Sequence, residues 1–172
     1  MKTYFCDACA LINQPNYIFE LNGLVIIHSI TLEELDKKAE KSTTNGKNAR
    51  NVINALFHLW KMGDLLKGVK INNAIIKLDY RKPKSELLTF GYDPKKHDNM
   101  LLAILTEIEN ENKLNEEEIY FLTGDRGLTI KSCDHKVIYL ANSNFNKEEY
   151  KNKKYWKKDT IKKNKNKKVN RG

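Results

Sequence analysis

Acidic residues at the ends of predicted structural elements are the candidates for chemistry in this sequence. Asp7 follows the first predicted strand, Glu34 lies in the first turn after the second, and Asp125 follows a later strand. Asp98 opens the helix that leads into that later strand. Carboxylate oxygens without clustered His or Cys are ligands that suit Mg²⁺ or Mn²⁺. A hard metal held by carboxylates can activate water for phosphodiester hydrolysis.

Each of these acids also has a purely structural interpretation. Glu34 can be the capping-box partner of Thr31, while Asp98 and Asp125 can be helix N-caps. Asp7 is harder to explain in this way, because it lies within the apolar stretch 5–11 and a buried, unpaired carboxylate is costly. Four converging carboxylates would repel one another and raise each other's pKa unless a cation neutralised them.

Strands and helices alternate along the chain. The predicted strands are 3–6, 24–28, 69–79, 119–123 and 136–141, and the predicted longer helices are 31–39, 47–66 and one that begins at Asp98. The stretch 42–46 reads as a break, 82–96 as a loop, and a short helix follows Gly124. This alternation predicts an α/β fold, a three-layer α/β/α sandwich with a central parallel sheet of four to five strands. In such sheets the active site lies outside the carboxyl ends of the strands, where the predicted acids stand.

The charge of the chain is divided between two regions. The net charge is +9, and the last 26 residues hold 12 of the 31 basic and 3 of the 22 acidic residues. Residues 1–146 therefore carry 19 charges of each sign, which predicts a neutral domain followed by a basic, partly disordered Lys/Asn-rich tail over 147–172. This distribution excludes a uniformly basic, nucleic-acid-coating protein.

The tail has two interpretations. Aromatic rings among lysines could stack on bases while the lysines follow the phosphates, and the candidate nucleic-acid-binding residues are Lys153, Lys154, Tyr155, Trp156, Lys157 and Lys158. Alternatively, the tail is a solubilising extension that reflects a lysine-rich genome composition.

Several other classes of protein are disfavoured. The sequence contains no GxxxxGK[ST] motif of a Walker-type ATPase, no apolar run long enough to span a membrane, and an acid where a signal peptide needs its apolar run. We therefore expect a cytoplasmic protein. A zinc site from Cys6 and Cys9 with Cys133 and His135 is disfavoured, because the predicted sheet places the two pairs at opposite edges. A phosphatase with an aspartyl nucleophile would need an acid where Cys9 stands.

Four segments together resemble a PIN-domain nuclease. They are Phe5-Cys6-Asp7-Ala8-Cys9-Ala10-Leu11-Ile12, Thr31-Leu32-Glu33-Glu34-Leu35-Asp36, Asp98-Asn99-Met100-Leu101-Leu102 and Leu122-Thr123-Gly124-Asp125. The Glu-Glu-Leu-Asp stretch and the later Asn48-Ala49-Arg50 look most like the PIN modules that accompany PhoH-type ATPases, although this sequence has no ATPase part. The resemblance covers residues 1–142. One departure is Ala8, where many members of the family carry Ser or Thr.

The resemblance implies Mg²⁺- or Mn²⁺-dependent endonucleolytic cleavage of single-stranded RNA, with DNA as an open alternative. By the same resemblance, the metal-binding and catalytic acids are Asp7, Glu34, Asp98 and Asp125, and the supporting residues are Thr123, Asp36 and Arg50. The family's acid-before-leucine spacing favours Glu34 over Glu33.

Two alternatives to a free-standing nuclease stay open. One is the same chemistry in a growth-inhibiting toxin held by a protein antitoxin, as in many small PIN proteins, and the resemblance also implies pairing into a homodimer. The other is a non-catalytic RNA-binding or scaffold module, since a fold does not fix a function.

Overall fold

The central feature of the protein is a mixed sheet of six strands in the order β3-β4-β2-β1-β5-β6. The structure is a computed structural model, and it describes residues 1–84, 93–113 and 117–142. The strands are β1 (Lys2–Cys6), β2 (Gly23–His28), β3 (Val69–Ile71), β4 (Ala74–Asp79), β5 (Glu118–Thr123) and β6 (Val137–Tyr139). All neighbouring strands are parallel except β3, which pairs antiparallel with β4 at one edge.

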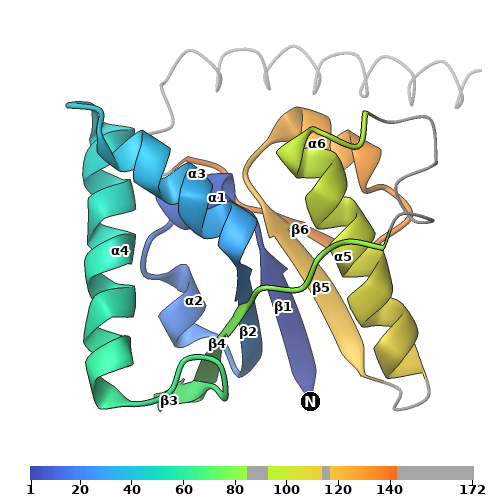
Figure 1. Ribbon diagram of the computed structural model, residues 1–172, viewed down its shortest axis with the longest axis horizontal. Coiled ribbons are helices and arrows are strands. Elements are labelled where there is room, and N and C mark those ends of the chain that lie inside the picture. The colour runs from blue at the N-terminus through green and yellow to red at the C-terminus, as the bar shows by residue number, and fades with distance from the viewer. Residues whose placement is uncertain (85–92, 114–116, 143–172) are drawn as a thin grey trace, which may run out of the picture. The chain divides into compact units, whose positions relative to one another are not determined.

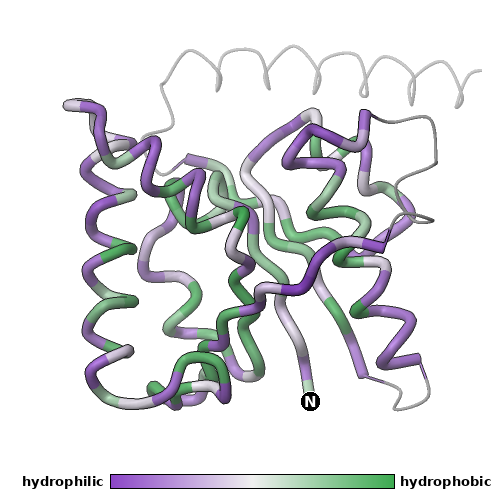
Figure 2. The backbone as a smooth tube through the Cα atoms, viewed as in Figure 1, coloured by the Kyte–Doolittle hydropathy of each residue, from purple (hydrophilic) through white to green (hydrophobic). Residues whose placement is uncertain are grey.

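Helices cover both faces of this sheet (Figure 1). They are α1 (Ala8–Asn13), α2 (Tyr17–Glu20), α3 (Ser29–Ala39), α4 (Thr44–Met62), α5 (His97–Asn112) and α6 (Arg126–Lys131). Figure 2 shows that hydrophobic residues concentrate along the strands and on the helix sides that face them. The predicted α/β/α sandwich is therefore confirmed.

The core consists of two hydrophobic layers, one on each face of the sheet. Successive side chains of a strand point to opposite faces of the sheet and so enter different layers. Tyr4 and Cys6 of β1 belong to the layer under α1 and α4, whereas Phe5 belongs to the layer under α5. Cys6 and Phe5 are completely buried. The near-continuous apolar sequences of β1 and β2 reflect this burial on both faces.

The sheet has more strands than the predicted four to five. The stretch 69–79 reads as one strand in the sequence but folds as the hairpin β3–β4. Its turn contains Asn72 with φ 52°, a left-handed conformation that asparagine adopts more readily than most residues. The two short helices α1 and α2, which the sequence did not predict, fill the connection between β1 and β2.

The predicted capping box at Thr31 and Glu34 is wrong. Helix α3 begins two residues earlier, with His28 as the N-cap whose ring Nδ1 accepts a hydrogen bond from the Ile30 amide at 3.2 Å. Thr31 is completely buried, and its Oγ1 donates to the Cys6 carbonyl at 3.0 Å. This bond ties α3 to the carboxyl end of β1.

The remaining differences from the predicted elements are small. Helix α4 begins at Thr44 instead of Lys47, because Thr43 caps it by accepting a hydrogen bond from the Gly46 amide at 3.1 Å. It ends at Met62 and not at Leu66. Most of the predicted loop 82–96, the predicted boundary at 146/147 and the whole tail, including Lys153 to Lys158, lie outside the described residues.

None of the helices in the described ranges is long and apolar enough to cross a membrane.

We predict that Thr31→Val destabilises the protein by about 1–3 kcal/mol, because it removes a buried hydrogen bond while keeping the side-chain volume. Urea unfolding followed by circular dichroism would measure this change. Thr106→Val is the matched control, since the Thr106 hydroxyl bonds only to the Leu102 carbonyl of its own helix. Equal losses in the two variants would contradict the assigned role of Thr31.

Candidate functional site

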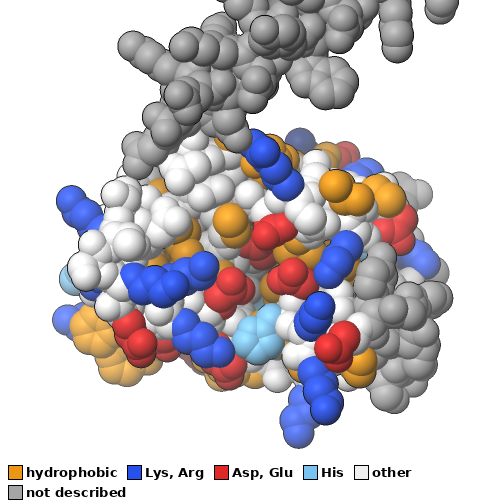
Figure 3. Space-filling view, turned by 90° about the horizontal axis from the view of Figure 1, so that it is seen from above, with side chains coloured by type: hydrophobic (Ala, Val, Ile, Leu, Met, Phe, Trp, Pro, Cys, Tyr) orange, Lys and Arg blue, Asp and Glu red, His pale blue; other side chains and the backbone are white. Residues whose placement is uncertain are grey.

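The candidate site lies at the carboxyl ends of the parallel strands. Strand β1 is flanked by β2 on one side and β5 on the other, so the segments that follow these three strands meet at one edge. The chain proceeds from β1 towards β2 and later returns to β5 on the opposite side, which makes this edge the topological switch point. Figure 3 looks down on this edge and shows acidic side chains in its middle, with basic side chains around them.

Asp7 is the buried centre of this group. Its side chain is 3% exposed and caps α1 by accepting hydrogen bonds from the amides of Ala10, at 3.1 Å, and Cys9. The hydroxyl of Thr123 donates to its other carboxylate oxygen. Burial raises the pKa of Asp7 to about 6, and the nearby charge of Glu34 acts in the same direction, while the three hydrogen bonds act against it.

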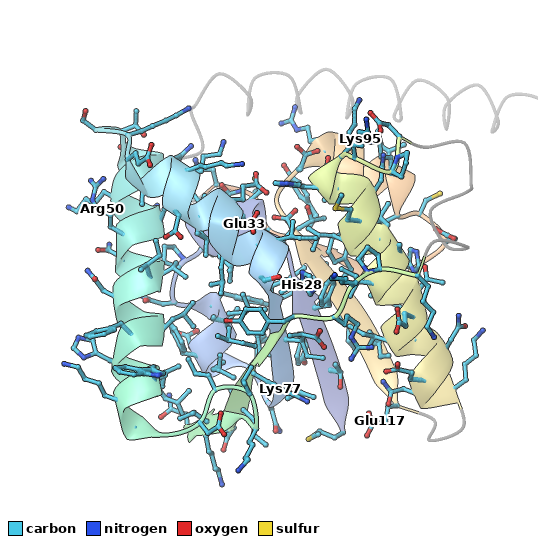
Figure 4. The ribbon with its side chains drawn as sticks, viewed as in Figure 1. His28, Glu33, Arg50, Lys77, Lys95 and Glu117 are labelled. Atoms are coloured by element: carbon cyan, nitrogen blue, oxygen red, sulfur yellow. The ribbon has the colours of Figure 1, made fainter. Side chains whose placement is uncertain are left out.

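Glu34, and not Glu33, is the acid of α3 that acts on Asp7. Glu34 is half-buried, and its charge contributes to the raised pKa of both Asp7 and Cys9. Glu33 is exposed, and its charge acts instead on His28, which lies on the same side of the molecule (Figure 4). The orientation of α3 therefore places the two neighbouring acids in different surroundings.

Thr123 links the loop after β1 to the loop after β5. Its completely buried hydroxyl donates to Asp7 and accepts a hydrogen bond from the amide of Asp125 at 3.1 Å. Asp125 caps α6 by accepting from the Leu128 amide at 2.8 Å, as the structural interpretation of the sequence expected. A Cβ at Gly124 would collide with the side chain of Asn13, so this turn requires glycine.

Cys9 is a residue of the site that sequence reasoning missed. Burial and then the charges of Asp7, Asp125 and Glu34 raise the pKa of this half-buried thiol to about 11. The charges of three predicted acids therefore act on one thiol, and that thiol is protonated at neutral pH. It contributes a neutral surface to the site and is not a nucleophile there.

Lys38 is a second residue that sequence reasoning missed. Its charge opposes the rise in the pKa of Cys9, which places a cation beside the acids. Lys38 follows Glu34 by four residues on α3, so the two lie on the same side of that helix. This i, i+4 spacing is the signal that could have identified it.

Asp98 comes to the same edge on the first turn of α5 (Figure 1). The N-cap of this helix is Lys96, so Asp98 is not the cap that its structural interpretation assumed. Its neighbour Asn99 is buried and donates to the Asp93 carbonyl at 2.7 Å, while Lys131 Nζ lies 3.5 Å from Asn99 Oδ1. These contacts fix the start of α5 against α6.

Asp36 and Arg50 are the other two predicted supporting residues, and unlike Thr123 both are exposed. Asp36 lies on α3. Arg50 points outward from α4 (Figure 4), and its guanidinium donates to the carbonyl of Lys41, at 3.0 Å, and to that of Ala39. Arg50 therefore satisfies the carbonyl end of α3, and its contacts are those of a helix cap.

The oxygen donors at this edge fit Mg²⁺ or Mn²⁺ by their chemistry, although they are not drawn together into a finished site. Within the described residues, no three His, Cys, Asp or Glu side chains lie close enough to hold a metal ion. The pKa of Asp7 is nevertheless raised, in part by the charge of Glu34, and a bound cation would lower this pKa.

We predict that ionisation of Asp7 destabilises the metal-free protein. An unfolded Asp titrates near pH 3.8 and Asp7 near pH 6, so the folded state holds the proton more tightly, and stability falls as the pH rises between these values. Relative to Asp7→Asn, the wild type should lose on the order of 2–3 kcal/mol between pH 4 and pH 7.5. Urea unfolding in EDTA at the two pH values would measure the difference.

Glu40→Gln is the control for this prediction, because Glu40 is an exposed acid at the end of α3. It should change stability by less than about 0.5 kcal/mol at either pH. Addition of Mn²⁺ at pH 7.5 should stabilise the wild type and leave Asp7→Asn unchanged. A difference between wild type and Asp7→Asn that does not vary with pH would contradict the assignment.

Comparison with known proteins bears on this arrangement. Searching the curated proteins yields no match. Among solved structures, a domain of a functionally unknown protein from Methanocaldococcus jannaschii DSM 2661 is similar, with 17% sequence identity and a TM-score of 0.50. The similarity covers 85% of this chain and 96% of that chain, and at this identity it supports the fold alone.

The family comparison is more informative. Residues 4–139 match the family model of the PIN domain, a span that contains all four predicted acids. Members of this family are generally nucleases that use divalent metals. The likeness to the modules of PhoH-type ATPases stays a prediction. Because this match spans most of the chain, and the mostly parallel sheet agrees with it, the chain belongs to the PIN-domain family.

Proposed function

We propose that this PIN-domain protein is a metal-dependent endoribonuclease that hydrolyses phosphodiester bonds in single-stranded RNA. The observation that carries the proposal is the buried Asp7 carboxylate, whose pKa is raised in part by the charge of Glu34. Hydrogen bonds through the Thr123 hydroxyl connect this carboxylate to the amide of Asp125. Family membership makes nuclease chemistry the expected class of reaction.

Each residue of the site has a role in this proposal. Asp7, Glu34, Asp98 and Asp125 would hold Mg²⁺ or Mn²⁺, which when bound supplies an activated water and stabilises negative charge on the phosphate. Thr123 holds the Asp7 carboxylate in a fixed orientation by donating its hydroxyl proton. Cys9 presents a neutral thiol beside the acids, and Lys38 supplies a positive charge that attracts a phosphate.

We predict that cleavage of an unstructured RNA in the presence of Mn²⁺ falls at least 100-fold in Asp7→Asn and in Asp98→Asn, because each variant removes a metal ligand. Gel analysis of an end-labelled RNA would measure the rates and distinguish internal from terminal cleavage. Glu40→Gln should retain wild-type activity. Equal activity in all variants would contradict the proposed site, and a DNA strand of the same sequence would establish the sugar preference.

Glu33→Gln and Glu34→Gln form a matched pair within this experiment. The half-buried Glu34 contributes to the raised pKa of Asp7 and Glu33 is exposed, so Glu34→Gln should reduce cleavage and Glu33→Gln should not. A larger loss in Glu33→Gln would reverse the ligand assignment. Growth arrest on expression of the wild type, abolished by Asp7→Asn, would add the toxin role, and RNA binding without cleavage would favour the non-catalytic alternative.

We also propose that the basic tail captures RNA. Deletion of 147–172 should weaken RNA affinity and flatten the dependence of affinity on salt, because fewer lysines would displace counterions from the phosphates. Fluorescence anisotropy of a labelled RNA from 50 to 200 mM salt would test this. Unchanged affinity and slope would leave the tail as a solubilising extension.

A further inference from the structure

The outer face of α4 differs in charge from the candidate site. The 19 residues of this helix include no Asp or Glu. Five of its exposed polar side chains recur at i, i+4, i+7, i+11 and i+14, and they are Lys47, Asn51, Asn54, His58 and Lys61. This spacing places cations and amides along one side of the helix, opposite the buried Val52, Leu56 and Leu59.

Two exposed aromatic rings lie on the neighbouring side of the same helix, next to Lys61. Phe57 is 50% exposed and Trp60 is 61% exposed, and their rings stack with centroids 5.6 Å apart. Lys61 Nζ lies 4.7 Å from the centre of the Phe57 ring. Exposed stacked rings of this kind contribute little to the core and mark an interaction surface.

A pocket adjoins these rings at the C-terminal end of α4. It has a volume of about 600 Å³ and is lined by Trp60, Gly63, Asp64, Leu65, Leu66, Leu78 and Tyr80. Tyr80 is 56% exposed, so the pocket has a second accessible ring in addition to Trp60. Three leucines make up much of the remaining lining. A flat aromatic group could therefore enter it against either ring.

The position of α4 connects this surface to the candidate site. The helix begins near the carboxyl edge of the sheet, where the acids lie, and runs along the sandwich to the opposite edge (Figure 1). Nineteen residues give it a length of about 28 Å. A strand bound along its outer face would extend several nucleotides away from the acids.

We propose that the outer face of α4, with Phe57, Trp60, Lys61 and Tyr80, binds single-stranded RNA by stacking on its bases. This inference rests on RNA being the substrate class of the proposed function. Exposed rings beside Lys61, on a helix without acids, match the bases and phosphates of an unpaired strand. The acid that lines the adjoining pocket, Asp64, is paired with Lys67 at 3.8 Å. A second copy of this chain fits less well, since like charges along α4 would then face each other.

Trp60 provides a direct test, because the chain has two tryptophans and the other is Trp156 in the tail. In full-length protein carrying Asp7→Asn and Trp156→Phe, Trp60 is the single source of tryptophan emission. Titration with a 20-nucleotide oligoadenylate in EDTA should quench this emission, whereas a duplex of equal length should not. Binding of the single strand, seen by anisotropy, without quenching would overturn the proposal.

Substitutions supply a second measurement in the same Asp7→Asn background. The double change Phe57→Ala and Trp60→Ala should weaken binding of the labelled oligoadenylate at least tenfold, the loss expected for one stacked base. Lys61→Gln should reduce the slope of log affinity against log salt by about 0.7. Met62→Ala is the matched control, since Met62 is 67% exposed on the same helix but has no ring, and its effect should stay within twofold.

The outcomes separate this inference from the proposed function. Cleavage that depends on Asp7, together with unchanged RNA affinity in the double variant, would overturn the α4 surface alone. Quenching of Trp60 by RNA that the wild type does not cleave would overturn the nuclease alone. A smaller species for the double variant in size-exclusion chromatography, with RNA affinity unchanged, would instead assign these rings to contact with a second copy.

Discussion

Burial of the Asp7 carboxylate at the carboxyl end of the central strand is the constraint on which the site depends. The charge of a buried carboxylate must be stabilised locally, and here two backbone amides of α1 and the Thr123 hydroxyl share that task. These partners require α1 to begin immediately after β1, and β5 to lie next to it. The glutamate that adds its charge to the same position is carried by α3, which Thr31 ties to the carbonyl before Asp7. The hydrogen bonds that position the predicted acids are therefore also the ones that hold α1, α3 and β5 around the end of β1.

The domain combines two regions of opposite character in one neutral body. Acids gather at one edge of the sheet, where they would repel an RNA phosphate until a cation is bound. Helix α4 carries cations, amides and rings but no acid, so the RNA contact proposed for it would not depend on metal. In the proposed function, such a division would allow an RNA strand to be held by one region and cleaved at another. The basic tail would add attraction over a longer range.

Much of the fold was accessible from the sequence, because strands buried on both faces produce continuous apolar runs. The runs at β1, β2 and β5 predicted a parallel sheet and its carboxyl edge correctly. The elements that escaped prediction are short. Helix α1 has six residues and depends on its cap at Asp7 and on core contacts, while the turn at Asn72 divides one apparent strand into β3 and β4. Neither leaves a periodic pattern, since each depends on local hydrogen bonding and tertiary packing.

The sequence by itself determined the types of the acids, their order along the chain and the ends of the elements that carry them. Only the tertiary structure decided which side chains meet. Helical periodicity gives the spacing of residues on α3 but not the rotation of the helix, which follows from its start at Ser29 and the Thr31 bond to β1. With that rotation Glu34 is half-buried and its charge raises the pKa of Asp7, whereas Glu33 is exposed and its charge acts on His28. The contact between Thr123 and Asp7 has a similar origin, because parallel neighbouring strands bring together loops that are distant in sequence.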